Sequence, residues 1–188
     1  WVWKAYSDDR GVDGTQTPER LHALLKQCRE TGVAGVKIDY FYDESQQVVR
    51  FYEDALKEAA KYQLMVDFHG ADKPTGLNRT FPNELTREGI RGLEIRGPWA
   101  THNTILPFTR YLAGPADFTP VTFSPKRLSE TSWCYQVATA VIFTSPFLCY
   151  GVDPEQLLAN PACDTVKSLP AVWDETIVAP GIKPGTAH

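Results

Sequence analysis

The sequence lacks a long apolar run, a clustered basic segment and a nucleotide-binding loop. Its longest apolar candidate, Val137 to Tyr150, is interrupted by polar residues and a proline, so it falls short of the roughly 18 residues that span a bilayer. The 19 basic residues are scattered and the formal net charge is −4, which argues against a polyanionic partner. Neither GxGxxG nor GxxxxGKS follows an expected strand. We therefore expect a neutral substrate, no nucleic-acid partner and no membrane partner.

Cysteine is also scarce. The four cysteines, Cys28, Cys134, Cys149 and Cys163, form no CxxC or Cys/His pattern, and two of them lie on the apolar side of expected helices. Free thiols in the core are favoured over disulfides or zinc, and cysteine usage indicates no cellular compartment.

The length limits the fold. With 188 residues, 43% of them hydrophobic, the chain can form a core but is shorter than the ~250 residues of a complete parallel α/β barrel. We see no signal peptide, internal repeat or clear linker between domains. Residues 1–188 are therefore expected to form one domain or part of one.

Apolar strands alternate with amphipathic helices in the first part of the chain. The patterns predict strands within Trp1–Tyr6, Val33–Tyr40 and Leu64–His69, and helices over Thr17–Gly32 and Glu44–Tyr62. Such strands, without polar alternation and separated by long helices, predict a parallel sheet covered on its outer face.

The rest of the chain is less regular. Residues 70–83 predict a long loop, which is usually functional, and further strands are expected at 92–95, 117–120 and 147–150. A helix is expected over 129–144, with its apolar stripe facing inward. About six strand units predict an α/β fold, either a (β/α)8 TIM-type barrel that is incomplete in this chain or an open doubly wound sheet.

Polar residues end three of the expected strands, where parallel α/β proteins place reactive groups. They are Asp39, His69 and Glu94. Lys37 shares a strand face with Asp39, and a nearby cation favours the ionised carboxylate that a nucleophile needs; a structural ion pair is the alternative. Two carboxylates on separate strand ends fit glycosidic chemistry, although 23 acidic residues also allow accidental pairs.

Other polar and aromatic residues have two interpretations each. Glu88 is either a charge near a helix end or an oxygen ligand of a hard cation such as Ca²⁺, which needs more oxygens than Glu88 and Glu94 supply. His69 fits a core histidine, a metal ligand or a sugar hydrogen-bond donor, and the last is favoured because no second histidine has ligand spacing. Five aromatic residues near strand ends fit either sugar stacking or the core: Trp1, Trp3, Tyr40, Phe41 and Trp99.

A series of short motifs spans nearly the whole chain. They are GVKIDY at 35–40, LMVDFHG at 64–70, KPTGL at 73–77, RTFPN at 79–83, TREG to GLE at 86–94, LPFTR at 106–110, AGP with the following aspartate at 113–117, and PAVWDET at 170–176. In this order they resemble glycoside hydrolase family 97, a family of exo-acting α-glycosidases.

The resemblance implies a (β/α)8 barrel between an N-terminal β-sandwich and a C-terminal β domain, both without a counterpart in this chain. It also implies a calcium ion near Glu94, with Glu88 and Glu94 as metal ligands and a further ligand from a part without a counterpart here. A periplasmic or extracellular location follows by the same resemblance. Because an incomplete barrel exposes strand edges, three explanations stay open: a partner chain or oligomer that completes it, proteolysis of a longer chain, or an unusual packing.

Two residues indicate the mechanism that the resemblance implies. Inverting members, typified by α-glucosidases, carry a glutamate where this chain has Gly70 and lack the aspartate found here as Asp39. Retaining members, typified by α-galactosidases, have the aspartate as nucleophile and the glycine. The resemblance thus implies a retaining exo-α-glycosidase acting on oligosaccharides, with α-galactosidase as the favoured activity. Asp39 is then the nucleophile and Glu94 the acid/base. Substrate-binding side chains are expected at Lys37, His69 and Trp99.

Three alternatives stay open. They are a non-catalytic carbohydrate-binding or assembly fragment, an inverting α-glucosidase, and a parallel α/β enzyme of another reaction type.

Overall fold

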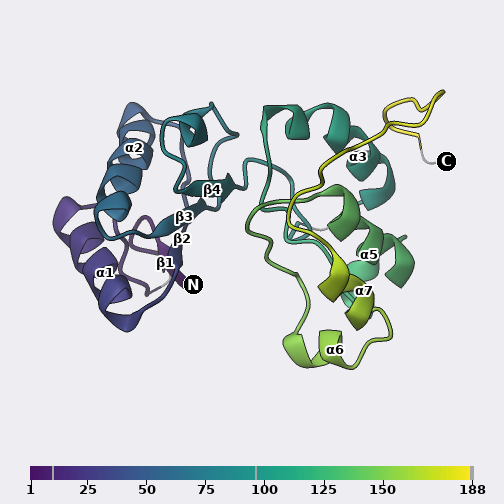
Figure 1. Ribbon diagram of the computed structural model, residues 1–188, viewed down its shortest axis with the longest axis horizontal. Helices are drawn as coiled ribbons and strands as arrows, with labels where there is room; N and C mark the ends of the chain where they lie inside the picture. The colour runs from purple at the N-terminus through teal and green to yellow at the C-terminus, as the bar shows by residue number, and fades with distance from the viewer. Residues whose placement is uncertain (10, 96, 187–188) are drawn as a thin grey trace. The chain divides into compact units, whose positions relative to one another are not determined.

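A computed structural model describes residues 1–9, 11–95 and 97–186 (Figure 1). The chain divides into two units, Trp1–Gly89 and Ile90–His188, although no linker composition marks the boundary between them. Among the described residues, no helix combines the length and the apolar character that crossing a bilayer requires.

The first unit is an α/β structure with a four-stranded parallel sheet in the order β1-β2-β3-β4. Two helices connect the first three strands and pack on the same side of the sheet (Figure 1). The elements are β1 (Val2–Ala5), α1 (Pro18–Thr31), β2 (Gly35–Asp39), α2 (Gln46–Lys61), β3 (Met65–Phe68), the short 3-10 helix η1 (Leu77–Arg79) and β4 (Glu84–Arg87). The predicted α/β class, the first three strands and both helices are confirmed.

Local signals in the sequence fix both helix starts and one helix end. The Thr17 side chain accepts a hydrogen bond from the backbone N–H of Arg20, and proline follows Thr17 at the first helical position of α1. Ser45 caps α2 in the same way through the N–H of Val48. Gly32 ends α1 in the left-handed region, with φ +76°, where glycine has no steric penalty.

Strand alternation gives the sheet two different faces. On the helix side, Val36, Ile38, Val66 and Phe68 are fully buried in the apolar core with both helices. Burying such side chains stabilises the fold by about 1.5–3 kcal/mol each. The opposite face carries mainly polar side chains. The strand register aligns four residues across it, namely Trp3, Lys37, Asp67 and Thr86.

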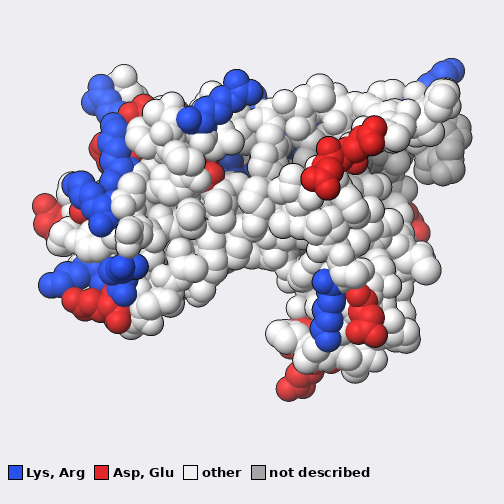
Figure 2. All heavy atoms as spheres, in the orientation of Figure 1, with Lys and Arg blue, Asp and Glu red and all other residues white. Residues whose placement is uncertain are grey.

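Charges of both signs intermix over the surface of the first unit's helices (Figure 2). Lys57 forms an ion pair with Glu53 at 3.0 Å, one turn apart on α2. Lys61 pairs with Glu58 at 2.5 Å on the same helix. Pairs of this kind stabilise a helix by a few tenths of a kcal/mol each, so they favour the helical conformation of α2 slightly and do not determine where it packs.

The fourth strand corrects the sequence analysis. The strand expected at 92–95 is wrong, since residues 93 and 94 form a turn, and the sheet ends instead with β4. β4 has the sequence Glu-Leu-Thr-Arg, and its buried charges compensate each other through an ion pair of Arg87 with Glu84 at 2.5 Å. An apolar pattern cannot find a strand that buries paired charges.

The second unit is helical over its described residues. Its core contains Leu93, Trp99, Leu106, Phe118 and Phe143. The elements are α3 (Trp99–Ile105), η2 (Leu106–Phe108), η3 (Arg110–Ala113), α4 (Pro125–Leu128), α5 (Trp133–Ile142), α6 (Pro154–Leu158) and α7 (Cys163–Ser168).

Three expectations for this unit are wrong. No described strand occupies 117–120 or 147–150. In the first segment Thr119 has φ +56°, a conformation that strands exclude and that is costly for a β-branched residue. The helix expected over 129–144 exists as the shorter α5, but it buries Gln136, Thr139 and Ala140 instead of its apolar stripe. Ile142 of that stripe is 56% exposed.

Candidate active site

Asp39 ends β2, and two N–H groups hold its carboxylate. The indole Nε1 of Trp3 donates to Oδ2 at 2.8 Å, and the backbone N of Tyr40 donates to Oδ1 at 2.6 Å. Tyr40 reaches this position with φ +67°, a left-handed conformation that is unfavourable for residues other than glycine. The buried carboxylate is therefore fixed by a neighbouring strand and by a strained turn.

Gly70 lies beside this carboxylate and leaves it space. Its φ is +61°, and a Cβ atom at this position would lie 3.2 Å from Oδ1 of Asp39 and 3.3 Å from the backbone N of Tyr40. Both the backbone conformation and the lack of room therefore favour glycine here. A larger residue would press against the carboxylate of Asp39.

Glu88 follows β4 and joins the same edge of the sheet. Its Oε2 accepts a hydrogen bond from the backbone N of Gly70 at 2.6 Å, and its Oε1 lies 3.5 Å from Nε2 of His69. The backbone N of His69 donates to the carbonyl of Ile38 at 2.8 Å. The carboxyl ends of β2, β3 and β4 thus bring Asp39, His69 and Glu88 to one edge, as a parallel sheet does.

Lys37 has an ion-pair partner that the sequence analysis did not consider. Its Nζ lies 3.7 Å from Oδ2 of Asp67, the residue aligned with it on β3. Asp67 is fully buried, so this pair places a charged group inside the polar face of the sheet. The substrate role of Lys37 stays a prediction.

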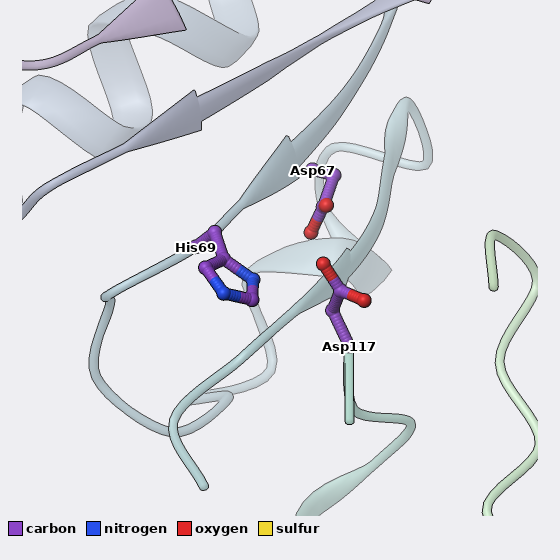
Figure 3. A group of neighbouring side chains, drawn as sticks. All are labelled: Asp67, His69 and Asp117. Carbon is purple, nitrogen blue, oxygen red and sulfur yellow. The ribbon is translucent and has the colours of Figure 1, made fainter. Parts of the chain in front are cut away.

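Potential metal ligands are present in each unit. Figure 3 shows Asp67 and His69 at β3, where they offer a carboxylate and an imidazole, both common ligand types. Glu88 offers a further carboxylate at this edge, and its Oε2 accepts the hydrogen bond from Gly70. Asp117, also drawn in Figure 3, belongs to the second unit and is fully buried.

Glu94 lies in the second unit, in an exposed turn rather than at a strand end. The backbone N of the preceding residue, Leu93, donates to the carbonyl of Phe118 at 3.1 Å and anchors the turn. Glu94 lines a cavity of about 200 Å³ together with Lys126 and Arg127.

Trp99 lies in the core of the second unit and is 2% exposed. It begins α3, whose first two N–H groups, those of Trp99 and Ala100, donate to Oε1 of Glu130. The hydroxyl of Ser129 and then the N–H of Ala100 lower the pKa of Glu130 to about 2. Burial places the Trp99 ring among core side chains, and its predicted contact with substrate is untested.

Two features of the site were not predicted. Trp3 was expected either to stack on a sugar or to lie in the core, whereas its hydrogen bond to Asp39 joins residues 36 positions apart. Glu130 caps α3 across 30 positions, and nothing in its local sequence signals this. The alignment of Trp3 with Lys37 on neighbouring strands comes from the strand register, which neither segment shows by itself.

Comparison with known proteins indicates which family the chain resembles. Residues 3–90 match the family model of Glycoside hydrolase 97. A probable retaining alpha-galactosidase of Streptomyces bingchenggensis is 38% identical over 96% of this chain and 30% of its own length. The retaining alpha-galactosidase of Bacteroides thetaiotaomicron is 35% identical over 86% of this chain and 27% of its own length.

Solved structures agree. A family 97 enzyme of Pseudoalteromonas sp. strain K8 in complex with acarbose superposes with a TM-score of 0.76 at 27% identity, over 92% of this chain and 30% of that one. A beta-arabinopyranosidase superposes with a TM-score of 0.81 at 27% identity, over 97% of this chain and 33% of that one. The resemblance to glycoside hydrolase family 97 that the motifs indicate is thus confirmed. The chain spans about 30% of the length of the Streptomyces relative.

Proposed function

We propose that this chain carries the catalytic residues of a retaining exo-α-glycosidase of family 97, with α-galactosides as substrates. The observation that carries the proposal is the position of Gly70 beside Asp39. A Cβ atom on Gly70 would lie 3.2 Å from Oδ1 of Asp39, and glycine has none. The relatives named retaining alpha-galactosidase support the same mechanism. A nucleophile needs open space on the side from which the anomeric carbon approaches, and glycine provides it.

The proposed reaction is a double displacement. Asp39 attacks the anomeric carbon and forms a glycosyl ester, while Glu94 donates its proton to the glycosidic oxygen of the leaving group. Glu94 then takes a proton from water, the water oxygen bonds to the anomeric carbon, and the ester bond to Asp39 breaks. The mechanism requires the two carboxyl groups to be about 5–5.5 Å apart in the working enzyme, whereas more than about 6.5 Å would favour inversion.

The polar face of the sheet suits a neutral, hydroxyl-rich ligand. The ammonium group of Lys37 and the ring of His69 are the proposed donors to sugar hydroxyls, and Trp99 is the proposed contact in the second unit. When bound, calcium would supply positive charge near the leaving group, and Glu88 and Glu94 are its proposed ligands. The periplasmic or extracellular location expected from the family is part of the same proposal.

We infer that the sheet is one section of a (β/α)8 barrel. Its strands follow one another in chain order, all parallel, with both helices on one side. A doubly wound sheet would reverse the order at a switch point and carry helices on both faces. Closing such a barrel requires strands next to β1 and β4, from further sequence or from a partner chain or oligomer. The family's flanking β-sandwich and C-terminal β domain belong to the same proposal.

The decisive experiment substitutes Asp39→Ala and measures hydrolysis of a nitrophenyl α-galactoside with and without azide. We expect the variant to lose activity and azide to restore turnover, giving β-galactosyl azide, because azide takes the place of the missing carboxylate. Asp54→Ala is the matched control, since Asp54 is an exposed acid on α2; it should keep wild-type activity.

Three outcomes would contradict the proposal. Full activity of the Asp39 variant, or the absence of an inverted azide product, would remove Asp39 as the nucleophile. Sugar binding without any turnover by the pure wild-type protein would instead favour a carbohydrate-binding role.

A further inference from the structure

The carboxylate of Asp39 is held in one plane. Each of its oxygens accepts one hydrogen bond, from Trp3 on β1 and from the backbone of Tyr40. Carboxylate torsions in aspartate are broad and roughly two-fold, so an unrestrained group would rotate. Because the two donors contact different oxygens and come from different segments, rotation would break both hydrogen bonds.

The two donors also fix each other. The Trp3 and Tyr40 rings meet edge to face, with centroids 5.3 Å apart and planes at 78°. Tyr40 adopts φ +67°, which turns its N–H toward Asp39 at a conformational cost. The strained turn therefore supplies one donor directly and packs against the indole that supplies the other.

Each carboxylate oxygen has two acceptor positions, and one donor on each oxygen leaves one position available for bond formation. A group already held in the geometry of attack loses less freedom on reaching the transition state. We propose that Trp3 is a positioning residue for the nucleophile, acting through its indole N–H on Oδ2 of Asp39. The inference rests on the proposed function, because it needs Asp39 to be the attacking group.

A second tryptophan provides a matched control within the same chain. Trp173 Nε1 donates to the carbonyl of Val141 at 2.8 Å, the same length as the bond from Trp3 to Asp39. The two tryptophans are also equally exposed, 39% for Trp173 and 40% for Trp3. They differ in the acceptor, a backbone carbonyl in one case and the proposed nucleophile in the other.

The test compares Trp3→Phe with Trp173→Phe in the full chain, using the nitrophenyl α-galactoside. Losing a hydrogen bond to a charged group should lower kcat of Trp3→Phe on the order of ten- to hundredfold, with KM little changed because an aromatic ring remains. Trp173→Phe should keep the wild-type kcat and KM. Replacing Trp3 by benzothienylalanine, which exchanges only the N–H for sulfur, should lower kcat as Trp3→Phe does even if the phenylalanine variant folds poorly.

A spectroscopic measurement does not depend on turnover. In a ¹H–¹⁵N spectrum, Asp39→Asn should move the indole signal of Trp3 upfield, because the acceptor loses its charge, and should leave the signal of Trp173 in place. The Trp3→Phe and Trp173→Phe spectra assign the two signals by their absence.

The outcomes separate the two claims. An inactive wild-type protein, or an Asp39→Ala variant that stays active, overturns the proposed function and the role of Trp3 with it. If Asp39→Ala is rescued by azide but the benzothienylalanine variant keeps the wild-type kcat, only the inference about Trp3 fails. If the indole signal of Trp3 does not shift in Asp39→Asn, the inference about Trp3 is also overturned.

Discussion

Arg87 is the buried charge whose removal should change the first unit most. It is 1% exposed, and its guanidinium lies 2.5 Å from both Glu84 and Asp72. The same group stacks over two aromatic rings, 4.5 Å from the centroid of Tyr52 and 5.3 Å from that of Phe68. Two ion pairs and two ring contacts therefore depend on one side chain, which points to the helix side of β4.

The substitution Arg87→Met keeps an apolar chain and removes the charge. Breaking a buried ion pair from one side costs about 3–5 kcal/mol, because the remaining carboxylate is left uncompensated. This is a large part of the ~5–15 kcal/mol that stabilises a typical domain. With a urea dependence of about 2 kcal/mol/M, the unfolding midpoint should fall by about 2 M.

The loss should depend on pH through Glu84. Burial raises the pKa of Glu84, and Arg87 opposes that shift, so the pKa should rise further in Arg87→Met. A carboxyl group with a raised pKa holds its proton more tightly in the folded state, and stability therefore falls as pH rises above the ordinary value of 4.5. The difference between variant and wild type should accordingly shrink as the pH is lowered from 7 toward 4.5.

Urea unfolding followed by circular dichroism measures both effects. Arg87→Met/Glu84→Gln should recover part of the loss, since the amide needs no counter-charge. Arg79→Met is the control, because Arg79 is exposed on η1 and its removal should cost less than about 0.5 kcal/mol. The reasoning is refuted if Arg87→Met costs no more than Arg79→Met, or if the double variant is no more stable than the single one.

Two further predictions concern helix ends. The pKa of Glu130 is lowered from 4.5 to about 2, so the stabilisation that its carboxylate provides is complete above pH ~4.5 and is lost as the pH falls toward 2. The difference in unfolding free energy between wild type and Glu130→Gln, measured by urea unfolding, should therefore vanish over that range. A difference that stays constant with pH would contradict the assignment. After the end of α2, Gln63 has φ +56°, and Gln63→Gly should raise the melting temperature by removing about 1 kcal/mol of backbone strain. After α1, Gly32 has φ +76°, and Gly32→Ala should lower the melting temperature by introducing such strain. Shifts of the same sign in both variants would contradict the argument.

The sequence predicted the first unit well because its signals are local. The polar residues that begin both helices form hydrogen-bonded caps. The periodic apolar residues of α2 are all buried, namely Val48, Tyr52, Ala55, Leu56 and Ala59. β4 was missed because its burial depends on Arg87 meeting Glu84, and a hydrophobic pattern registers only apolar burial. The wrong face of α5 was predicted to be buried for a related reason. Gln136 is buried with its Nε2 donating to Thr131 at 2.9 Å, so a polar residue occupies a core position that periodicity reserves for apolar ones.

The candidate site was predicted to the extent that strand ends determine it. Asp39 and His69 follow from the rule that parallel strands carry reactive groups at their carboxyl ends, and the structure places both at that edge. Glu94 was assigned to the end of a strand within 92–95, whereas the chain forms a turn at residues 93 and 94. Contacts set by register, such as Lys37 with Asp67, require the strand pairing and cannot be obtained from either segment alone.

The loop after β3 links the stability of the first unit to the geometry of its site. On the polar side, Glu88 holds the N–H of Gly70 at 2.6 Å, and on the helix side Arg87 holds Asp72, two residues further along. The loop is thus fixed from both faces of the sheet by consecutive residues of one segment. Gly70 in turn lies against Asp39, so a loop released on the helix side would also move the glycine that leaves space beside this carboxylate. If the proposed function holds, a folded Arg87→Met protein should therefore lose turnover that Arg79→Met retains.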